Sequence, residues 1–250
     1  MEPVVDDDIS TASISVFVEA SYNDVINITD EANSGILSSY KTLSNCSIIQ
    51  RDSANHTDAD SIIIDFGTTN CICNDSINRR GKIIVAYTKK YTDSASVHTI
   101  TFSDYYVNDN KIDGTKTVKN KGHNSSKNLN WDITANGTIT LSNNEGIISW
   151  VSVRNREKIF GDSTSIWSDD KYSLTGTSSG TTANGINYTV NIINPLIRDM
   201  SASCMKYFVK GTFDFSPSGK LTRTVNFGDG TCDNKVTVTI AGKIYQMNLK

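Results

Sequence analysis

The sequence predicts an all-β protein whose antiparallel sheets form sandwich-like modules, with one amphipathic helix at the N-terminus. From Leu43 onward, apolar residues alternate with Thr, Ser and Asn, a period of two that is typical of strands with one wet face. Clusters of Asn, Asp and Gly interrupt the alternation at short intervals, as turns do in layered antiparallel sheets. Only five of the 27 acidic residues are Glu, a bias that also favours strands and turns.

Length and charge narrow the class of protein further. A chain of 250 residues allows one large β-domain or two of ordinary size. The net charge is -3 and the Lys and Arg residues are scattered, so nucleic acid is not expected as a partner. No stretch approaches the roughly 18 apolar residues of a membrane span. Met1-Glu2-Pro3 leads directly into an acidic run, so we expect an exported protein whose leader segment has been removed.

The N-terminal region divides into a tether and a helix. Residues 1–9, which contain Pro3 and three consecutive Asp residues, are expected to be an exposed tether. Residues 10–35 are expected to form the helix, with Ser10 or Thr11 as N-cap and Gly35 beyond its end. The helix should cover a sheet face or edge. Its apolar positions recur at helical intervals: Ile14, Phe17, Tyr22, Val25, Ile28 and Ala32, of which Phe17, Val25 and Ile28 are expected to be buried.

The first β-module is expected over residues 36–125. The segment from Tyr105 to Gly114 is its clearest hairpin, because Asn108-Asp109-Asn110 accepts positive φ at the turn. Residues 119–130, rich in Asn, Ser and Lys, are expected to be a linker, and the module boundary is placed there. The strands predicted in this half are Cys46–Gln50, Ser61–Asp65, Lys82–Thr88, Ser96–Val107 and Lys111–Lys119.

The second β-module is expected over residues 126–250 and repeats the same pattern of strands separated by turns. Pro195 is predicted to interrupt the sheet before the strand that begins at Cys204. The longest strands are expected to be bent or bulged. The predicted strands are Trp131–Thr134, Gly137–Ser142, Gly146–Phe160, Lys171–Thr177, Ile186–Ile193, Cys204–Phe215, Leu221–Phe227, Lys235–Ala241 and Lys243–Leu249.

A turn sequence occurs once in each half of the chain. Residues 226–234 read Asn-Phe-Gly-Asp-Gly-Thr-Cys-Asp-Asn, and residues 65–74 are a looser copy with Phe66-Gly67 and Cys71. A strand precedes each copy and a Gly-Lys-Ile strand follows it. We expect Phe66 and Phe227 to be buried at equivalent places, with Gly67 and Gly228 in a conformation that only glycine adopts without strain.

The five cysteines form an early group of three and a late pair. In an oxidising compartment we expect one disulfide per module, Cys204 to Cys232 and Cys46 to either Cys71 or Cys73, with one thiol left over. A metal site made by Cys46, Cys71, Cys73 and His56 is the alternative. The short Cys-x-Cys spacing and the lack of a second Cys-x-x-Cys disfavour it.

One catalytic motif occurs in the chain. Residues 176–180 match Gly-x-Ser-x-Gly, but a nucleophile elbow needs a helix after the serine, and a Thr- and Gly-rich segment follows here. His56, His98 and His123 all precede Ser178, the reverse of the hydrolase order. We therefore expect residues 176–180 to be a loop and the histidines to be surface or turn residues. No catalytic residue and no cofactor is assigned.

Two groups of side chains are candidates for binding. Asp229 and Asp233 lie in the repeated turn, and such oxygen-rich turns bind calcium, although side chains bonded to their own backbone are the favoured interpretation. Aromatic faces for sugar rings are offered by Trp131, Trp167, Tyr105 and Tyr106. Trp131 and Trp167 have polar sequence neighbours, so we expect both to be exposed.

A set of short aromatic and glycine-containing segments spans roughly residues 60 to 250. They are Phe66-Gly67 with Cys71, Arg79-Arg80-Gly81-Lys82-Ile83, Tyr105-Tyr106-Val107-Asn108, and Phe227-Gly228-Asp229-Gly230 with Cys232-Asp233-Asn234. Together they resemble a family of exported lipoproteins of Bacteroidota that has no assigned activity. The resemblance implies a β-rich protein anchored by lipid at the outer membrane or cell surface. The lipidated N-terminal cysteine of that family is missing from this sequence.

The function expected from these observations is non-enzymatic binding or structural support at the cell surface, with the ligand left open. Polysaccharide or other surface proteins are the expected partners, and a membrane only through the lipid anchor. Carbohydrate recognition through exposed aromatic residues is one alternative. Hydrolysis of surface polysaccharide is another, and it requires paired carboxylates about 5 to 10 Å apart in a cleft.

Overall fold

The computed structural model describes residues 8–33, 45–51, 60–164, 166–201 and 204–249. Two short 3-10 helices, η2 (Ser142–Asn144) and η3 (Trp167–Asp169), lie in loops between strands. The longer elements are α1 (Ser10–Asn33), β1 (Ile48–Arg51), β2 (Asp60–Asp65), β3 (Cys71–Ile72), β4 (Asn78–Tyr87), β5 (Val97–Val107), β6 (Asn110–His123), β7 (Leu129–Thr140), β8 (Ile147–Phe160), β9 (Lys171–Thr181), β10 (Asn187–Asp199), β11 (Phe208–Pro217), β12 (Arg223–Asp229), β13 (Lys235–Ile240) and β14 (Lys243–Asn248).

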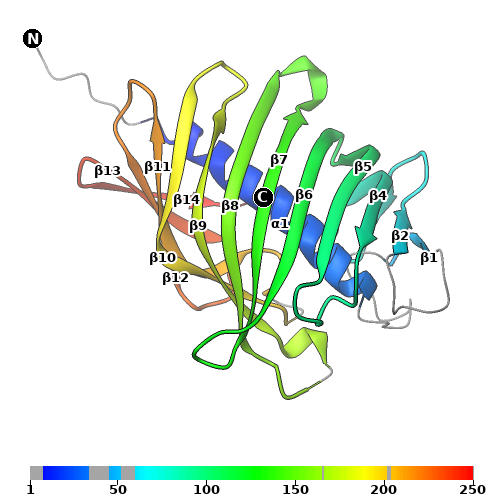
Figure 1. Ribbon diagram of the computed structural model, residues 1–250. Helices are drawn as coiled ribbons and strands as arrows, with labels where there is room; N and C mark the ends of the chain where they lie inside the picture. The colour runs from blue at the N-terminus through cyan, green and yellow to red at the C-terminus, as the bar shows by residue number, and fades with distance from the viewer. Residues whose placement is uncertain (1–7, 34–44, 52–59, 165, 202–203, 250) are drawn as a thin grey trace, which may run out of the picture.

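The strands form one 14-stranded antiparallel sheet in which neighbours in space are nearly always neighbours in sequence. The order runs from β1 through β2 and β4 to β14, and the short β3 pairs with β4 beside this path. The sheet curves, and α1 runs across its strands as the layer packed against it (Figure 1). The prediction of an all-β protein with antiparallel strands and one N-terminal helix is confirmed. None of the described helices combines the length and apolar character that a membrane span needs.

The core lies between α1 and the sheet face that turns toward it. In β7 the buried side chains Trp131, Ile133, Ala135 and Ile139 alternate with more exposed ones, as the period of a strand requires. Tyr22 of α1 stacks on Trp150 of β8 with ring centroids 4.3 Å apart. The predicted alternation of the sequence therefore locates the face of the sheet that carries the core.

Helix α1 begins at Ser10, as expected, and is buried on most of its circumference because the sheet curves around it. Val25 and Ile28 are fully buried, which confirms two of the three predicted core positions. Phe17 is only partly buried, so its prediction was wrong. Helical periodicity identifies a face but does not tell how far a curved sheet reaches around it. Residues 1–7 of the expected tether and Gly35 lie outside the described residues. The end of the expected tether is not fully exposed, because Asp8 and Ile9 are half-buried and Ile9 packs against the core.

Gly137 of β7 allows the close approach of α1 to the sheet. A Cβ at this position would collide with the Tyr22 hydroxyl oxygen and the Asp113 carbonyl oxygen. The single O–H of this residue has two carbonyl oxygens within hydrogen-bond distance, that of Asp113 at 3.1 Å and that of Thr138 at 3.4 Å. The side chain of Tyr22 therefore lies directly over the β6–β7 pair because glycine leaves room for it.

The sheet continues across the expected module boundary between residues 125 and 126. The expected linker, residues 119–130, is the end of β6, a short turn and the start of β7, and His123 pairs with Leu129. The two strands predicted between Trp131 and Ser142 are one strand, β7. Polar composition suggested a linker here, but strand pairing between β6 and β7 extends the ladder to the end of the hairpin.

Two other local predictions differ from the structure, one of them only in part. Residues 176–180, expected to be a loop, belong to β9, which is paired on both sides by β8 and β10. Pro195 does not end its strand, because β10 continues to Asp199 with register shifts between Ile192 and Ile197. At residues 176–180, pairing with neighbouring strands prevails over the turn preference of the local sequence. Around Pro195 the pairing with β9 is interrupted between Asn191 and Leu196, as predicted, but the strand continues beyond the interruption.

The duplicated turns share their geometry. Phe66 and Phe227 are each buried, and Gly67 and Gly228 have φ of 81° and 90°. The side-chain oxygen two residues before each glycine, on Asp65 or Asn226, accepts a hydrogen bond of 2.8 Å from the glycine N–H. The prediction about these turns is confirmed.

The Gly-Lys-Ile segments that follow the duplicated turns are not equivalent. Gly81 lies within β4, where its N–H donates to the Gly67 carbonyl oxygen at 2.7 Å. Gly242 instead lies in the turn that joins β13 to β14, next to Ala241. The likeness of the two units is therefore limited to the strand end and its Phe-Gly turn.

Candidate functional site

A pocket of about 230 Å³ opens beside the C-terminal end of α1. Its walls come from α1, the β4–β5 turn, β7, β8, the β8–β9 loop and β9. The side chains that define its chemistry are two carboxylates and four aromatic residues: Asp30, Asp170, Tyr91, Trp131, Trp167 and Tyr172. The topology brings together segments that lie far apart in the sequence.

Trp131 forms the aromatic centre of the pocket wall. Its ring stacks on Tyr91 with centroids 5.3 Å apart and meets Tyr172 edge-on at 6.3 Å. Its Nε1–H donates to the Tyr91 carbonyl oxygen at 3.4 Å, which fixes the turn that carries Tyr91. Trp167, on η3 in the β8–β9 loop, lines the same pocket. The structure thus unites two of the four aromatic residues singled out from the sequence.

Trp131 and Trp167 were expected to be exposed, and that expectation was wrong, because they are only 2% and 8% exposed. The polar neighbours of Trp131 in β7, Asn130 and Asp132, belong to the opposite face of the strand. Polar neighbours therefore carry no information about the exposure of a strand residue between them. Trp167 lies in a loop but belongs to the buried hydrophobic core.

Each carboxylate of the pocket is held by a cation. Arg156 Nη1 donates to Asp30 Oδ2 at 2.6 Å. Lys158 Nζ lies 2.8 Å from Asp170 Oδ1, and the Tyr172 hydroxyl donates to Asp170 Oδ2 at 2.7 Å. Burial raises the pKa of both carboxyl groups, and the neighbouring cations act in the opposite direction.

Three polar atoms that line the pocket lack a hydrogen-bond partner among the described residues; one of them, Asp170 Oδ1, lies 2.8 Å from the ammonium of Lys158, and the other two have no ion-pair partner either. These two are the donor Trp167 Nε1 and the acceptor Asp30 Oδ1, both buried. A buried donor or acceptor left unsatisfied costs about 1 to 3 kcal/mol, so such atoms are normally bonded to protein, water or ligand. The pocket therefore offers one donor and one acceptor to an occupant.

The other two aromatic candidates lie elsewhere. Tyr105 is fully buried and packs in the core against Phe66 and Phe102, with centroids 5.9 and 5.6 Å away. Tyr106 is covered by the guanidinium of Arg80, whose Cζ lies 3.8 Å from the ring centroid. Neither residue lines the pocket of Trp131 and Trp167. Both offer less free ring surface than the sequence suggested.

Sequence reasoning did not identify the remaining residues of the pocket, Asp30, Tyr91, Asp170 and Tyr172. Asp30 lies on a helix, and in the sequence the acidic residues of this helix resemble those of a solvent-exposed face. Tyr91 lies in a polar turn. The one available signal was Tyr172, the second residue of the predicted strand Lys171–Thr177 and two residues after Asp170, although this spacing alone does not indicate a site.

The cysteines pair as the sequence predicted. Cys204 is joined to Cys232, and Cys46 is joined to Cys71 rather than to Cys73. These two disulfides indicate an oxidising, extracytoplasmic environment. His56, the fourth ligand of the alternative metal site, lies outside the described residues.

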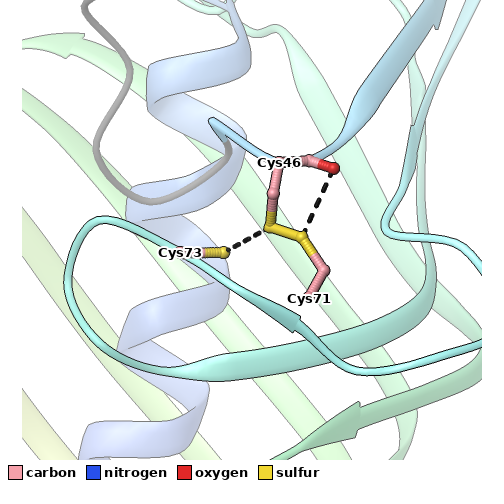
Figure 2. A group of neighbouring side chains, drawn as sticks. All are labelled: Cys46, Cys71 and Cys73. Carbon is pink, nitrogen blue, oxygen red and sulfur yellow. Dashed lines mark hydrogen bonds between the residues drawn. A yellow bond between two sulfur atoms is a disulfide. The ribbon is translucent and has the colours of Figure 1, made fainter.

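The remaining thiol lies against a disulfide. Cys73 is free and buried, and its Sγ lies 3.0 Å from Cys46 Sγ. Figure 2 shows Cys46 Sγ between the sulfurs of Cys71 and Cys73. Burial raises the pKa of the Cys73 thiol, so its reactive thiolate form is disfavoured.

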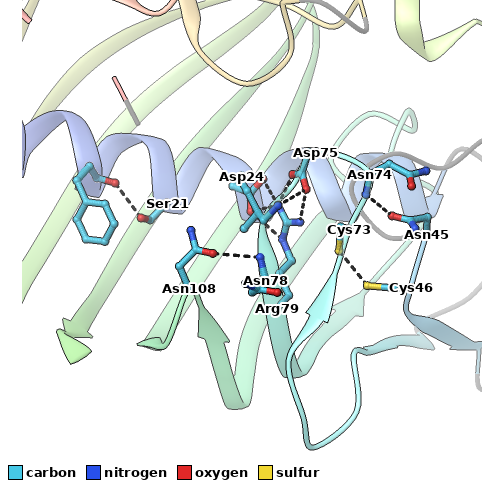
Figure 3. A network of polar contacts seen from close by, with 12 residues as sticks. Ser21, Asp24, Asn45, Cys46, Cys73, Asn74, Asp75, Asn78, Arg79 and Asn108 are labelled. Carbon is cyan, nitrogen blue, oxygen red and sulfur yellow. Dashed lines mark hydrogen bonds and ion pairs between the residues drawn. The ribbon is translucent and has the colours of Figure 1, made fainter. Parts of the chain in front are cut away.

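An ion network fastens this region to α1. The guanidinium of Arg79, which is fully buried, donates to Asp24 of α1 at 2.8 Å and to Asp75 of the β3–β4 turn at 2.7 Å (Figure 3). The same figure places Cys73 beside this turn. Because one guanidinium of β4 bonds to carboxylates on two other elements, the network is suited to hold the helix, the turn and β4 together.

The calcium candidates make local hydrogen bonds. Asp229 Oδ1 accepts from the Thr231 N–H at 3.2 Å and from its hydroxyl at 2.9 Å, and Asp233 Oδ1 accepts from the Lys235 N–H at 3.0 Å. Both side chains bond to nearby residues of the turn, which was the favoured interpretation of these residues.

Ser178 of the Gly-x-Ser-x-Gly match is buried beneath α1. Its hydroxyl donates to Glu19 Oε1 at 3.2 Å and accepts from Arg154 Nη2 at 3.0 Å. Its partners are therefore an ion pair rather than a histidine. His98 was expected at the surface or in a turn, but it is buried in β5, where burial lowers its pKa to about 4. His123 is exposed, as expected.

Comparisons of the chain with protein-family models, with curated proteins and with solved structures found no match.

Proposed function

We propose that the chain is a non-enzymatic binding protein that holds a sugar ring in the pocket between Trp131 and Trp167. The observation that carries this proposal is the combination of aromatic walls with one unpartnered donor, Trp167 Nε1, and one unpartnered acceptor, Asp30 Oδ1. Ligand sites of this kind pair apolar and aromatic surface with a few placed polar groups.

A hydroxylated ring satisfies both sets of features. Each hydroxyl group donates one hydrogen bond and accepts others, so a sugar can bond to Trp167 and Asp30 together. The C–H face of the ring packs on aromatic surface. The pocket, at about 230 Å³, is smaller than the roughly 300 to 1,000 Å³ of sites for drug-sized ligands. It therefore fits one ring, such as a terminal residue, better than the middle of a chain.

The hydrolase alternative has one observation in its favour. Asp30 and Asp170 line the same pocket, and burial raises the pKa of each, as a general acid requires. However, Arg156 and Lys158 already bind these carboxylates at 2.6 and 2.8 Å. Because both groups are engaged as ion pairs, they support a fixed pocket wall better than proton transfer.

The site of action follows from two separate observations. The disulfides require an oxidising compartment, and the aromatic and glycine segments resemble exported lipoproteins of Bacteroidota. We infer that the protein works at the outer membrane or cell surface, held by a lipid anchor, where polysaccharide and other surface proteins are at hand.

A glycan array followed by calorimetry tests the binding proposal. Trp167→Phe keeps an aromatic ring and removes the N–H donor, so we expect binding of the selected sugar to weaken about 2- to 12-fold, the worth of one hydrogen bond. Tyr106→Phe, which removes a hydroxyl outside the pocket, is the control and should bind as wild type does. Failure to bind any glycan, or equal affinity of both variants, contradicts the proposal. Release of free sugar that is abolished by Asp170→Asn would support the hydrolase instead.

A further inference from the structure

A second and smaller cavity, of about 20 Å³, lies between α1 and strands β8 to β11. Asn27 of α1, Arg156 of β8, Tyr172 of β9 and Arg198 of β10 are among the residues that line it. Arg156 and Tyr172 separate this cavity from the sugar pocket: Tyr172 lines both, and Arg156 bonds to Asp30 of the pocket.

Residues that line this cavity carry four buried hydrogen-bond donors that have no partner in the described part of the chain. Arg198 Nε and Nη1, Arg156 Nη2 and Asn27 Nδ2 are all buried and have no hydrogen-bond partner among the described residues. The three residues are only 6%, 4% and 3% exposed, so bulk water does not satisfy them. Buried polar groups in folded proteins are nearly always bonded, so these donors are suited to bind an acceptor.

The charge of the cavity is also unbalanced. Arg156 is paired with Asp30, but no ion pair of Arg198 occurs among the described residues. The carboxylate that acts on Arg198 electrostatically is Asp24, and its oxygens already bond to Arg79. Burial and the charge of Arg156 lower the pKa of Arg198 to about 10. The guanidinium is therefore still charged at neutral pH. Two guanidinium groups thus line one buried space.

Aromatic rings hold both guanidinium groups in place. Arg156 Cζ lies 3.5 Å from the ring centroid of Tyr172, and Arg198 Cζ lies 5.3 Å from that of Phe208. Such contacts stabilise a cation but supply no hydrogen-bond acceptor in the plane of its N–H groups. The donors are therefore positioned and remain available.

We propose that this cavity is a buried binding site for a small inorganic anion of the size of chloride. A halide accepts several N–H hydrogen bonds at once and offsets the second guanidinium charge, which a water molecule cannot do. A volume of about 20 Å³ exceeds the roughly 10 to 15 Å³ needed for one water-sized occupant. The cavity is too small for an organic anion such as gluconate.

The anion also bears on the sugar pocket. Arg156 Nη1 donates to Asp30 Oδ2 at 2.6 Å and to the Tyr91 hydroxyl at 3.1 Å, and both of these residues line that pocket. An anion bound to Nη2 fixes the same guanidinium from its other side. Loss of the anion should therefore loosen one wall of the sugar pocket.

Thermal unfolding in bromide and in gluconate, at constant ionic strength, tests the site. If bromide binds the folded protein, each tenfold rise in its concentration above Kd raises the Tm by about 3 to 5 °C for a chain of this size. Arg198→Met should lose this dependence. Arg80→Met, which removes a guanidinium near the surface, should keep it. Equal Tm in the two salts, or an unchanged bromide dependence in Arg198→Met, overturns the proposal.

Crystals of the wild-type protein grown in bromide provide a test that does not depend on the folding of any variant. An anomalous difference peak between Arg156 and Arg198 is the expected result. A cavity that holds only water, without an anomalous peak, overturns the proposal. If Arg198→Met does not fold, Arg198→Lys replaces it, and its bromide dependence should be weaker because a lysine offers no fork of N–H donors.

Discussion

The acidic side chains that α1 turns toward the sheet are matched by cations on individual strands. Glu19 pairs with Arg154 of β8, and both side chains are almost completely buried. Asp24 pairs with Arg79, and Asp30 with Arg156. A buried ion pair contributes little net stability, but removal of one partner leaves an uncompensated charge. These pairs therefore fix the position of the helix on the sheet.

For the Glu19–Arg154 pair we predict that Arg154→Met lowers the free energy of unfolding by about 3 to 5 kcal/mol. The double variant Glu19→Leu/Arg154→Met should recover most of that loss because no charge remains buried. Urea unfolding of the single and double variants measures both. Arg80→Met, which breaks the partly exposed pair with Asp109, is the control and should cost less than about 1 kcal/mol. A double variant as unstable as the single one would contradict this account.

The three sulfurs near β3 give a second prediction. Peptide mapping of the wild-type protein without reduction should show Cys46 joined to Cys71, and Cys73 as a thiol. In Cys71→Ser, the Cys73 Sγ, 3.0 Å from Cys46 Sγ, should take over and form a Cys46–Cys73 disulfide on oxidation. If both cysteines of this variant are alkylated as free thiols after oxidation, the proximity seen in Figure 2 does not hold in solution.

His98 should contribute a pH dependence to stability. Burial lowers its pKa from 6.5 to about 4 in the folded protein, so between these values the unfolded chain binds one proton more than the folded one. The stabilising contribution is therefore complete above pH 6.5 and lost as the pH falls toward 4, on the order of 3 kcal/mol.

Urea unfolding between pH 4 and 7, compared between wild type and His98→Phe, measures this contribution. The difference between the two proteins cancels the titration of groups they share, including Asp24 and Asp30, whose pKa values are raised. The variant should lose less stability than wild type on acidification. His123→Gln removes an exposed histidine and should follow wild type. Parallel curves for wild type and His98→Phe would contradict the prediction.

At the scale of elements, the burial of α1 increases toward its C-terminal end, where Val25 to Ala32 are all buried. Ile28 is fully buried against the sheet, whereas Phe17 lines an open groove of about 380 Å³ beside the C-terminal residues Met247 and Leu249. The periodicity of the sequence predicts that both side chains are buried. The curvature of the sheet separates them, because it encloses one and leaves the other at the rim.

We therefore predict that Ile28→Ala destabilises the protein by about 2 to 5 kcal/mol, as other large-to-small changes in a core do. Phe17→Ala removes a larger side chain but should cost less than Ile28→Ala, because part of the ring is already solvated. Denaturant unfolding of both variants decides the order. A larger loss for Phe17→Ala would mean that the groove is filled in solution.

At the scale of the whole molecule, the two expected modules are parts of one 14-stranded sheet. The β6–β7 pair, whose register runs from Lys111–Thr140 to His123–Leu129, joins them directly. Helix α1 also contacts both, through Arg79 of β4 and Arg154 of β8. A sheet divided here would expose the hydrogen-bonding edges of two long strands.

We predict that a fragment of residues 126–250 does not fold as a monomer, because it lacks α1 and the strand that pairs with β7. Circular dichroism and size-exclusion chromatography of the fragment, with the full chain as control, test this. Co-expression with residues 1–125 should restore a complex that unfolds cooperatively. A cooperative unfolding transition of the isolated fragment would support two independent modules instead.

The sequence by itself determined the features that depend on short stretches of chain. The alternation of apolar residues located nearly all strands of the sheet. The hairpin turn at Asn108 and Asp109 has φ of 46° and 66°, the positive values that Asn and Asp accept. The burial of Phe66 and Phe227 follows from a strand that ends in a glycine turn. Each of these features is set by residues that are close in sequence.

Only the tertiary structure decided where the sites lie. Glu19 and Arg154 are 135 residues apart in sequence, and Asp30 meets Trp131 and Trp167 only where α1 crosses the curved sheet. No local pattern distinguishes a buried ion pair from a solvated charge, or a pocket tryptophan from an exposed one. Burial depends on which surface covers a side chain, and here that surface is supplied by residues from distant parts of the chain.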